Sequence, residues 1–101
     1  GLSGGMARSM VAAMFADLER VESELAAKVK QSESSGRALR TDTVDGLGED
    51  AVKVKNRALL FAEMLGDKAR VLVEAATTLE KRIDEAADKS WTEADVRNAA
   101  K

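Results

Sequence analysis

The chain has 101 residues, of which 34% are charged and 3% aromatic, and its 16 basic and 18 acidic side chains leave a net charge of −2. This length allows one domain, and the interspersed charge excludes a protein that holds nucleic acid on a basic surface. The chain has no histidine, cysteine or proline, which excludes disulfides and thiol chemistry and leaves no residue that forbids a helix.

The first five residues, GLSGG, look like a remnant of cloning, so we expect one domain over residues 6–101. Near its start, the apolar run from Met10 to Ala16 is too short to span a bilayer. The run also lacks the charged lead and small-residue cleavage site of a secretory signal peptide. If the protein leaves its cell, we therefore expect a route that needs no cleaved signal peptide.

The first predicted helix covers residues 9–31, with Ser9 as a suitable N-cap. Its apolar side chains recur at steps of three and four residues, which is the pattern of an amphipathic helix. They are Val11, Met14, Leu18, Val21 and Leu25. Serine and glycine residues then predict a loop over residues 32–48, with room for one short helical turn between Arg37 and Asp45. A loop of this length between two helices either carries function or is mobile.

The second predicted helix covers residues 49–97, and Glu49 and Asp50 suit its positive amino-terminal end. Its main apolar stripe consists of Val54, Ala58, Phe61, Leu65, Ala69, Leu72, Ala76, Leu79, Ile83 and Ala86. Gly66 costs about 1 kcal/mol relative to alanine inside a helix, but the stripe passes Gly66 on the same face. We therefore predict one continuous helix of about 45 residues, roughly 65–70 Å long.

A second apolar stripe lies beside the first and consists of Leu60, Met64, Val71, Ala75 and Thr78. The shorter first helix can cover only one stripe, and a two-helix hairpin has no interior of its own. The sequence therefore predicts an all-α antiparallel hairpin that pairs with another hairpin, of the same or a different chain, into a four-helix bundle. The alternative is one wide core-facing surface in a three-helix fold. The predicted partner interface is Leu60, Phe61, Met64, Leu65, Val71, Leu72, Leu79 and Ile83.

The sequence lacks several of the residue types that enzymes use for catalysis. Without histidine and cysteine, the common bases, nucleophiles and soft metal ligands are missing. Carboxylate pairs such as Asp17 with Glu22 have helical spacings that direct them to solvent, and the four methionines are expected to fill packing gaps. We predict a binding or assembly protein, not an enzyme, with no catalytic residue, no cofactor, no metal and no small-molecule substrate.

The only tryptophan of the chain, Trp91, follows directly after Ser90, where the main stripe ends. Asp95 lies one helical turn further on the same face. One interpretation is that Trp91 packs the end of the bundle. The other is that Trp91 and Asp95 form an address, in which a groove reads one apolar anchor and one charge. The polar residues around Trp91 favour the address.

The stretch WTEAD, Trp91 to Asp95, resembles the signal of small helical-hairpin substrates of bacterial type VII (ESX) secretion systems. Those substrates carry an aromatic-x-x-x-Asp/Glu motif just after their second helix, and the nearest subgroup is the EspC-like substrates. The length of the chain and its lack of cysteine agree with the family. The chain departs from the WXG-type members, because the stretch between the predicted helices, SSGRALR, has no Trp-x-Gly.

The resemblance implies a protein that is cytoplasmic before export and is then secreted without a cleaved signal peptide. Trp91 and Asp95 would be read by the membrane-bound ATPase of the secretion system. The partner would be another helical hairpin or a larger effector, for which the chain serves as chaperone or targeting factor. The alternative is a cytoplasmic structural or adaptor coiled-coil protein with no export role. A membrane- or granule-surface protein fits less well, since acidic residues flank the apolar faces as often as basic ones.

Overall fold

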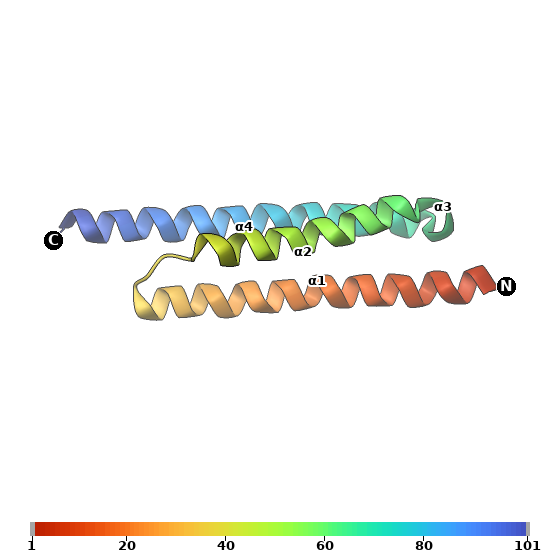
Figure 1. The fold of residues 1–101 in the computed structure, drawn as a ribbon, viewed down its shortest axis with the longest axis horizontal. Helices are drawn as coiled ribbons and strands as arrows, with labels where there is room; N and C mark the ends of the chain where they lie inside the picture. The colour runs from red at the N-terminus through yellow and green to blue at the C-terminus, as the bar shows by residue number, and fades with distance from the viewer. Residues whose placement is uncertain (1, 101) are drawn as a thin grey trace.

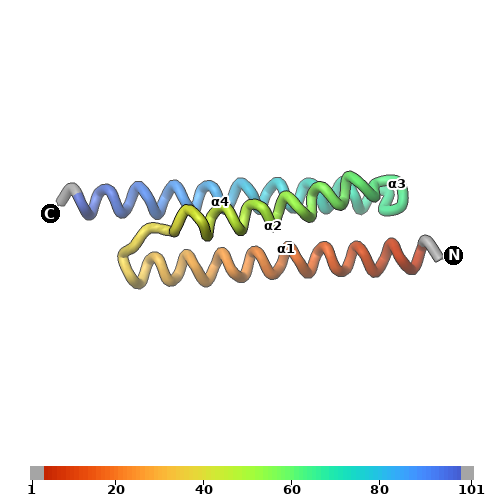
Figure 2. Tube along the Cα trace, viewed as in Figure 1, coloured from red at the N-terminus to blue at the C-terminus, as the bar shows by residue number. Residues whose placement is uncertain are grey.

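Three long helices lie side by side in the computed structural model, which describes residues 2–100 (Figures 1 and 2). In chain order, α1 spans Leu2–Ser35, α2 spans Thr41–Leu60, the short α3 spans Ala62–Leu65 and α4 spans Asp67–Ala100. The chain reverses direction between α1 and α2 and again at α3, so α1 and α4 run the same way. The result is a rod of 64 × 17 × 17 Å. The all-α fold class is confirmed for the described residues.

The apolar stripe predicted for the first helix forms one wall of the core. Its members Met14, Leu18, Val21 and Leu25 are all buried. Steps of three and four residues keep side chains on one face of a helix, and this face turns towards α2 and α4. The helix itself is longer than predicted, because it begins at Leu2 and ends at Ser35.

The long loop predicted over residues 32–48 is wrong, since only residues 36–40 connect α1 to α2. Gly36 directly follows the end of α1, and its positive φ of 71° is a conformation that glycine adopts without steric cost. Beyond the connection, Val44 and Leu47 are buried together with Ala51 on one face of α2. The burial of this face stabilises a helix that contains two glycines, each of which costs about 1 kcal/mol by itself.

The continuous second helix is also wrong, because the chain folds back on itself between Phe61 and Gly66 (Figure 1). Gly66 has φ 60° and ψ −134°, a conformation that residues with a Cβ atom rarely adopt. The apolar stripe keeps its helical phase on both sides of the turn, so the periodicity alone fits a straight helix and a folded one equally well. Folding back buries the stripe within one chain and needs no second molecule.

Small residues bring α2 and α4 close together. The buried alanines of these two helices are Ala51, Ala58, Ala69, Ala76 and Ala87. Larger side chains from all three long helices fill the remaining space, and the largest fully buried ones are Met14, Leu72, Leu79, Ile83 and Val21. The core therefore runs the length of the rod, and the three-helix alternative describes it better than a two-helix hairpin does.

Two ion pairs join the helices on the outside of the core. Lys55 of α2 lies 2.6 Å from Glu80 of α4, and Arg82 of α4 lies 2.8 Å from Glu22 of α1. Solvent-accessible pairs of this kind contribute little stability, so they help to align neighbouring helices and the apolar core stabilises the fold. Within the described residues, none of the helices has a stretch apolar enough and long enough to cross a membrane.

Candidate functional site

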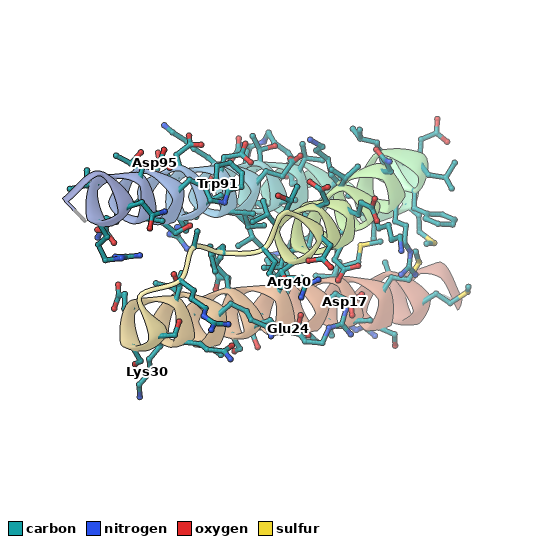
Figure 3. The ribbon with its side chains drawn as sticks, turned by 60° about the vertical axis from the view of Figure 1, so that its left-hand side comes forward. Asp17, Glu24, Lys30, Arg40, Trp91 and Asp95 are labelled. Atoms are coloured by element: carbon teal, nitrogen blue, oxygen red, sulfur yellow. The ribbon has the colours of Figure 1, made fainter. Side chains whose placement is uncertain are left out.

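Trp91 and Asp95 lie on α4 towards its carboxyl end, beyond the last buried layer of the core (Figure 3). That layer ends at Ser90, which is only 8% exposed, as the position of the stripe predicted. Trp91 is 37% exposed, and Asp95 is exposed. The two side chains are four residues apart in a helix and so project from the same face, about one turn from each other.

Trp91 is more tightly held than its polar neighbours suggest. Its indole Nε1–H donates a hydrogen bond of 2.9 Å to the carbonyl oxygen of Leu39, in the connection between α1 and α2. The backbone N–H of the same residue, Leu39, donates to Ser90 Oγ at 3.0 Å, and Ser90 in turn donates to the carbonyl oxygen of Ala87 at 2.8 Å. Adjacent side chains of α4 thus satisfy both backbone groups of the buried Leu39.

Arg97 fixes the start of the same connection, since its guanidinium donates a hydrogen bond to the carbonyl oxygen of Gly36. A Cβ atom at Gly36 would lie 3.7 Å from Arg97 Nε, so the backbone and the guanidinium are in close contact. Ser90, Trp91 and Arg97 together hold residues 36–40, and we call these three side chains the loop clamp. The clamp places the predicted export signal at a folded end of the bundle.

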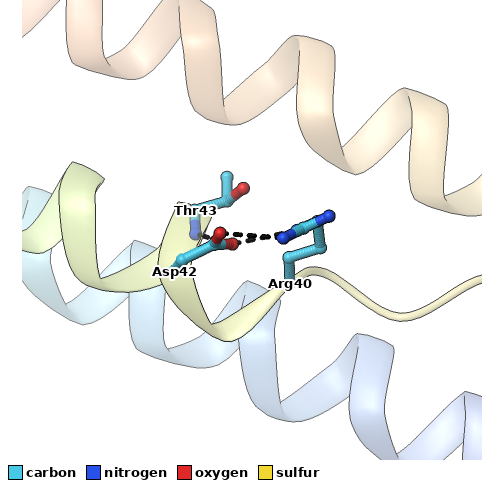
Figure 4. Close-up of polar contacts among 3 residues, drawn as sticks. All are labelled: Arg40, Asp42 and Thr43. Carbon is cyan, nitrogen blue, oxygen red and sulfur yellow. Dashed lines mark hydrogen bonds and ion pairs between the residues drawn. The ribbon is translucent and has the colours of Figure 1, made fainter.

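The first turn of α2 carries a local ion pair (Figure 4). Arg40 donates two hydrogen bonds to the Asp42 carboxylate, at 3.0 and 2.9 Å, and Asp42 accepts a third from the backbone N–H of Thr43 at 2.8 Å. Hydrogen bonding to Arg40 lowers the pKa of Asp42, and the same contact raises the pKa of Arg40. The stabilisation from Asp42 is therefore present above the pKa of the unfolded carboxyl and is lost as the pH falls through its lowered folded pKa. Both groups are fully exposed, so this contribution is small.

The predicted partner interface divides into two parts. Leu65, Leu72, Leu79 and Ile83 are buried in the core of their own chain. Other helices of the same chain cover them in this fold, so this part of the predicted interface faces the core and not a free surface. Leu60, Phe61 and Val71 are exposed and Met64 is half-buried, all at or next to the turn between α2 and α4.

An open groove of about 510 Å³ with a mainly acidic set of charged side chains lies between α2 and α4. Asp45, Glu49, Glu80 and Asp84 line it together with Lys53, and the ion pair with Lys55 occupies Glu80. Among the described residues, no three carboxylates lie close enough together to hold a metal ion.

The sequence interpretation missed Leu39 and the loop clamp. Leu39 is the one large apolar residue in the polar stretch SSGRALR, and an isolated leucine there is a signal that this stretch docks on a core. Contacts that join residues about fifty positions apart, as Leu39 and Ser90 are, cannot be deduced from local periodicity.

Comparison of the chain with protein families, with curated proteins and with solved structures finds no match.

Replacing Trp91 by alanine is expected to lower the free energy of unfolding by about 1–2 kcal/mol. The change removes a hydrogen bond to a buried carbonyl and the covered part of a large ring, which is less than the roughly 3–5 kcal/mol of a fully buried tryptophan. Trp91→Phe keeps an apolar ring but loses the N–H and the five-membered ring that carries it, so its expected cost is about 1 kcal/mol. Urea unfolding followed by circular dichroism measures both. A Trp91→Ala variant as stable as the wild type would show that the loop clamp does not depend on this side chain.

Proposed function

We propose that the chain is a non-enzymatic substrate or targeting partner of a type VII secretion system, with Trp91 and Asp95 as its export signal. The single observation that supports this most is the exposure of both side chains, one turn apart, beyond the last buried layer of the bundle. A receptor groove can take an apolar ring and orient it by one charge without unfolding α4.

Each residue of the signal has a chemical role in this proposal. The exposed edge of the Trp91 indole enters an apolar pocket of the receptor, while the hydrogen bond to Leu39 fixes the ring in one orientation. A ring that is already ordered loses little conformational entropy on binding. Asp95 meets a basic side chain or the amino-terminal end of a helix. The export ATPase is the receptor that the family resemblance implies.

A partner protein belongs to the same proposal. Leu60, Phe61 and Val71 are exposed at or next to the turn that contains α3. α3 lies at the opposite end of the rod from the α4 carboxyl end, which carries the signal (Figure 1). A helical partner or effector bound there would leave Trp91 and Asp95 accessible. The chain would then act as a targeting factor, with one end for its cargo and the other for the export machinery.

The test is export of Asp95→Ala into the culture medium by a host with the matching secretion system. Asp95 is exposed, so the variant should unfold within about 0.5 kcal/mol of the wild type, yet it should accumulate inside the cell. Glu93→Ala is the matched control, because it removes the same charge from an exposed site in the same turn. The control should be exported normally. Export of Asp95→Ala at the wild-type level would contradict the signal.

Trp91→Phe adds a second arm to this experiment. The variant keeps an aromatic ring and loses the hydrogen bond to Leu39. If the receptor needs only an aromatic side chain at this position, the variant should still be exported. Trp91→Ala is less informative by itself, because it also weakens the loop clamp. Retention of a folded Trp91→Phe variant inside the cell would show that the receptor reads the indole specifically.

The second candidate function is a structural or adaptor bundle with no export role. The hydrogen bond from Trp91 to Leu39 favours it, because a tryptophan that closes the end of a bundle needs no receptor. In that case Asp95→Ala and Glu93→Ala behave alike in every assay. The export experiment therefore separates the two candidates.

A further inference from the structure

The turn between α2 and α4 reverses the chain through only two interruptions of the helix, at Phe61 and Gly66. The helical hydrogen bonds from the N–H groups of Phe61, Leu65 and Gly66 to the carbonyl groups four residues earlier are all present, at 2.9–3.0 Å. Phe61, with φ −104° and ψ 22°, departs moderately from helical torsions, and Gly66 departs fully. Changes in a few backbone torsions therefore convert the turn into helix.

The straightened form would keep a usable apolar face. Val54 and Ala58 before the turn, and Ala69 and Leu72 after it, lie on one stripe in uninterrupted helical phase, although they now face each other across a hairpin. A straight helix would extend from Thr41 to Ala100 and carry this stripe along its whole length. Its two halves could no longer cover each other, so a second molecule would have to cover them.

Exposed apolar side chains gather at this turn. The exposed large apolar residues at this end of the rod are Met6, Leu59, Leu60, Phe61 and Val71, and Leu60 is the most exposed of them at 75%. Figure 1 shows why Met6 belongs to the group, since the amino terminus of α1 and α3 lie at the same end. Beyond this end, only Trp91 and Val96 are large, apolar and exposed among the described side chains.

We propose that a second copy of the chain covers this end by exchanging α4. In the exchanged dimer, the turn of each copy is straight, and α4 of one copy packs on α1 and α2 of the other. Every core contact between α4 and the other helices is re-formed between chains, so the dimer uses an interface that already exists. The two straightened turns meet at the centre of the dimer, where the exposed apolar side chains of both copies cover each other. The exchange does not rest on the proposed export role, and the exchanged dimer leaves no free turn end for a cargo.

Gly66→Ala is the variant that tests the exchange. No atom lies within 4 Å of a Cβ at Gly66, so the substitution acts through the backbone alone. Alanine disfavours the positive φ of the closed turn and favours the straight helix. After refolding at equal protein concentration, the ratio of dimer to monomer should rise about tenfold or more above the wild type, as measured by gel filtration with light scattering. Gly46→Ala is the control, since Gly46 lies inside α2 with equally open surroundings, and it should leave the ratio unchanged.

A chemical cross-link distinguishes exchange from simple contact between two turn ends. The chain has no cysteine, so Lys55→Cys with Glu80→Cys gives one unique pair, at the site of the ion pair between α2 and α4. In the exchanged dimer, a short bifunctional maleimide should link the cysteine at position 55 of one chain to the cysteine at position 80 of the other. In the monomer, it should link the two cysteines of the same chain. In the wild-type background, the fraction of cross-linked chain pairs should rise with the concentration during refolding. A Gly66→Ala variant that stays monomeric would overturn the proposal. A dimer that is cross-linked only within its chains would also overturn it. The same holds if no cross-link forms between wild-type chains at any concentration.

Discussion

Leu72→Asp is expected to unfold the chain at room temperature. Leu72 is fully buried in the second turn of α4, within the core that the three long helices form, and no basic side chain belongs to that core cluster. A buried carboxylate without a partner costs several kcal/mol, which approaches the whole stability of a domain of this size. Circular dichroism should show loss of most of the helical signal, and gel filtration should show an expanded species.

Thr78→Asp is the control for this experiment. It introduces the same residue into the same helix at an exposed site, so its free energy of unfolding should stay within about 0.5 kcal/mol of the wild type. If both variants unfold, or if Leu72→Asp remains folded, then the face of α4 that turns towards the core has been assigned wrongly.

Ala76→Phe is expected to cost about 3 kcal/mol or more, through overpacking. Ala76 lies on α4 and is fully buried. It belongs to the series of buried alanines that lets α2 approach α4. A phenyl ring there would push the helices apart and disturb the contacts of Leu72 and Leu79. Urea unfolding by circular dichroism measures the loss. The neighbouring site provides the control, since Thr77 is exposed and Thr77→Phe adds the same ring at the surface. Equal stability of the two variants would contradict close packing at Ala76.

The helical periodicity predicted much of the core correctly. Four of the five residues that it placed on one face of the first helix are buried and Val11 is partly buried. Leu65, Leu72, Leu79 and Ile83 of the main stripe are also buried. The prediction is correct because a helix repeats every 3.6 residues and because each apolar stripe is more stable when it is buried against another helix. The position of Ser90 at the end of the stripe, and of Trp91 one residue beyond it, follows from the same rule.

The reversal at Gly66 could not be predicted from periodicity. Gly66 costs about 1 kcal/mol inside a helix, which is too little to force a break, and the apolar face continues through it. Whether the chain continues as one helix or reverses at Gly66 depends on the free energies of two states. In one state the chain is folded back on itself, and in the other it is paired with a second molecule. The effective concentration of α4 next to α2 favours the folded-back state within one chain, and no single-residue preference records that advantage.

The connection between α1 and α2 also escaped the sequence interpretation. Its serines and glycines are typical of a long loop, and the burial of Val44 and Leu47 in α2 becomes apparent only when α4 is in place. The loop clamp depends in turn on this docking. Trp91 therefore has a structural contact as well as an exposed edge, so tests of the export signal should begin with Asp95, which can be changed without disturbing the fold.

The fold of the single chain depends on its reversal at Gly66, and one distance measures this reversal. Spin labels on Asp45→Cys and Asp84→Cys, two exposed residues that line the same groove of α2 and α4, report this distance by pulsed electron paramagnetic resonance. The protein should be dilute and shown to be monomeric by light scattering. Neighbouring helix axes are about 8–10 Å apart, so the folded-back chain predicts a label separation of roughly 20–25 Å or less once the label arms are included. A straight helix from α2 into α4 would separate the two sites by about 58 Å, and that distance in the monomer would contradict the fold and the site built on it.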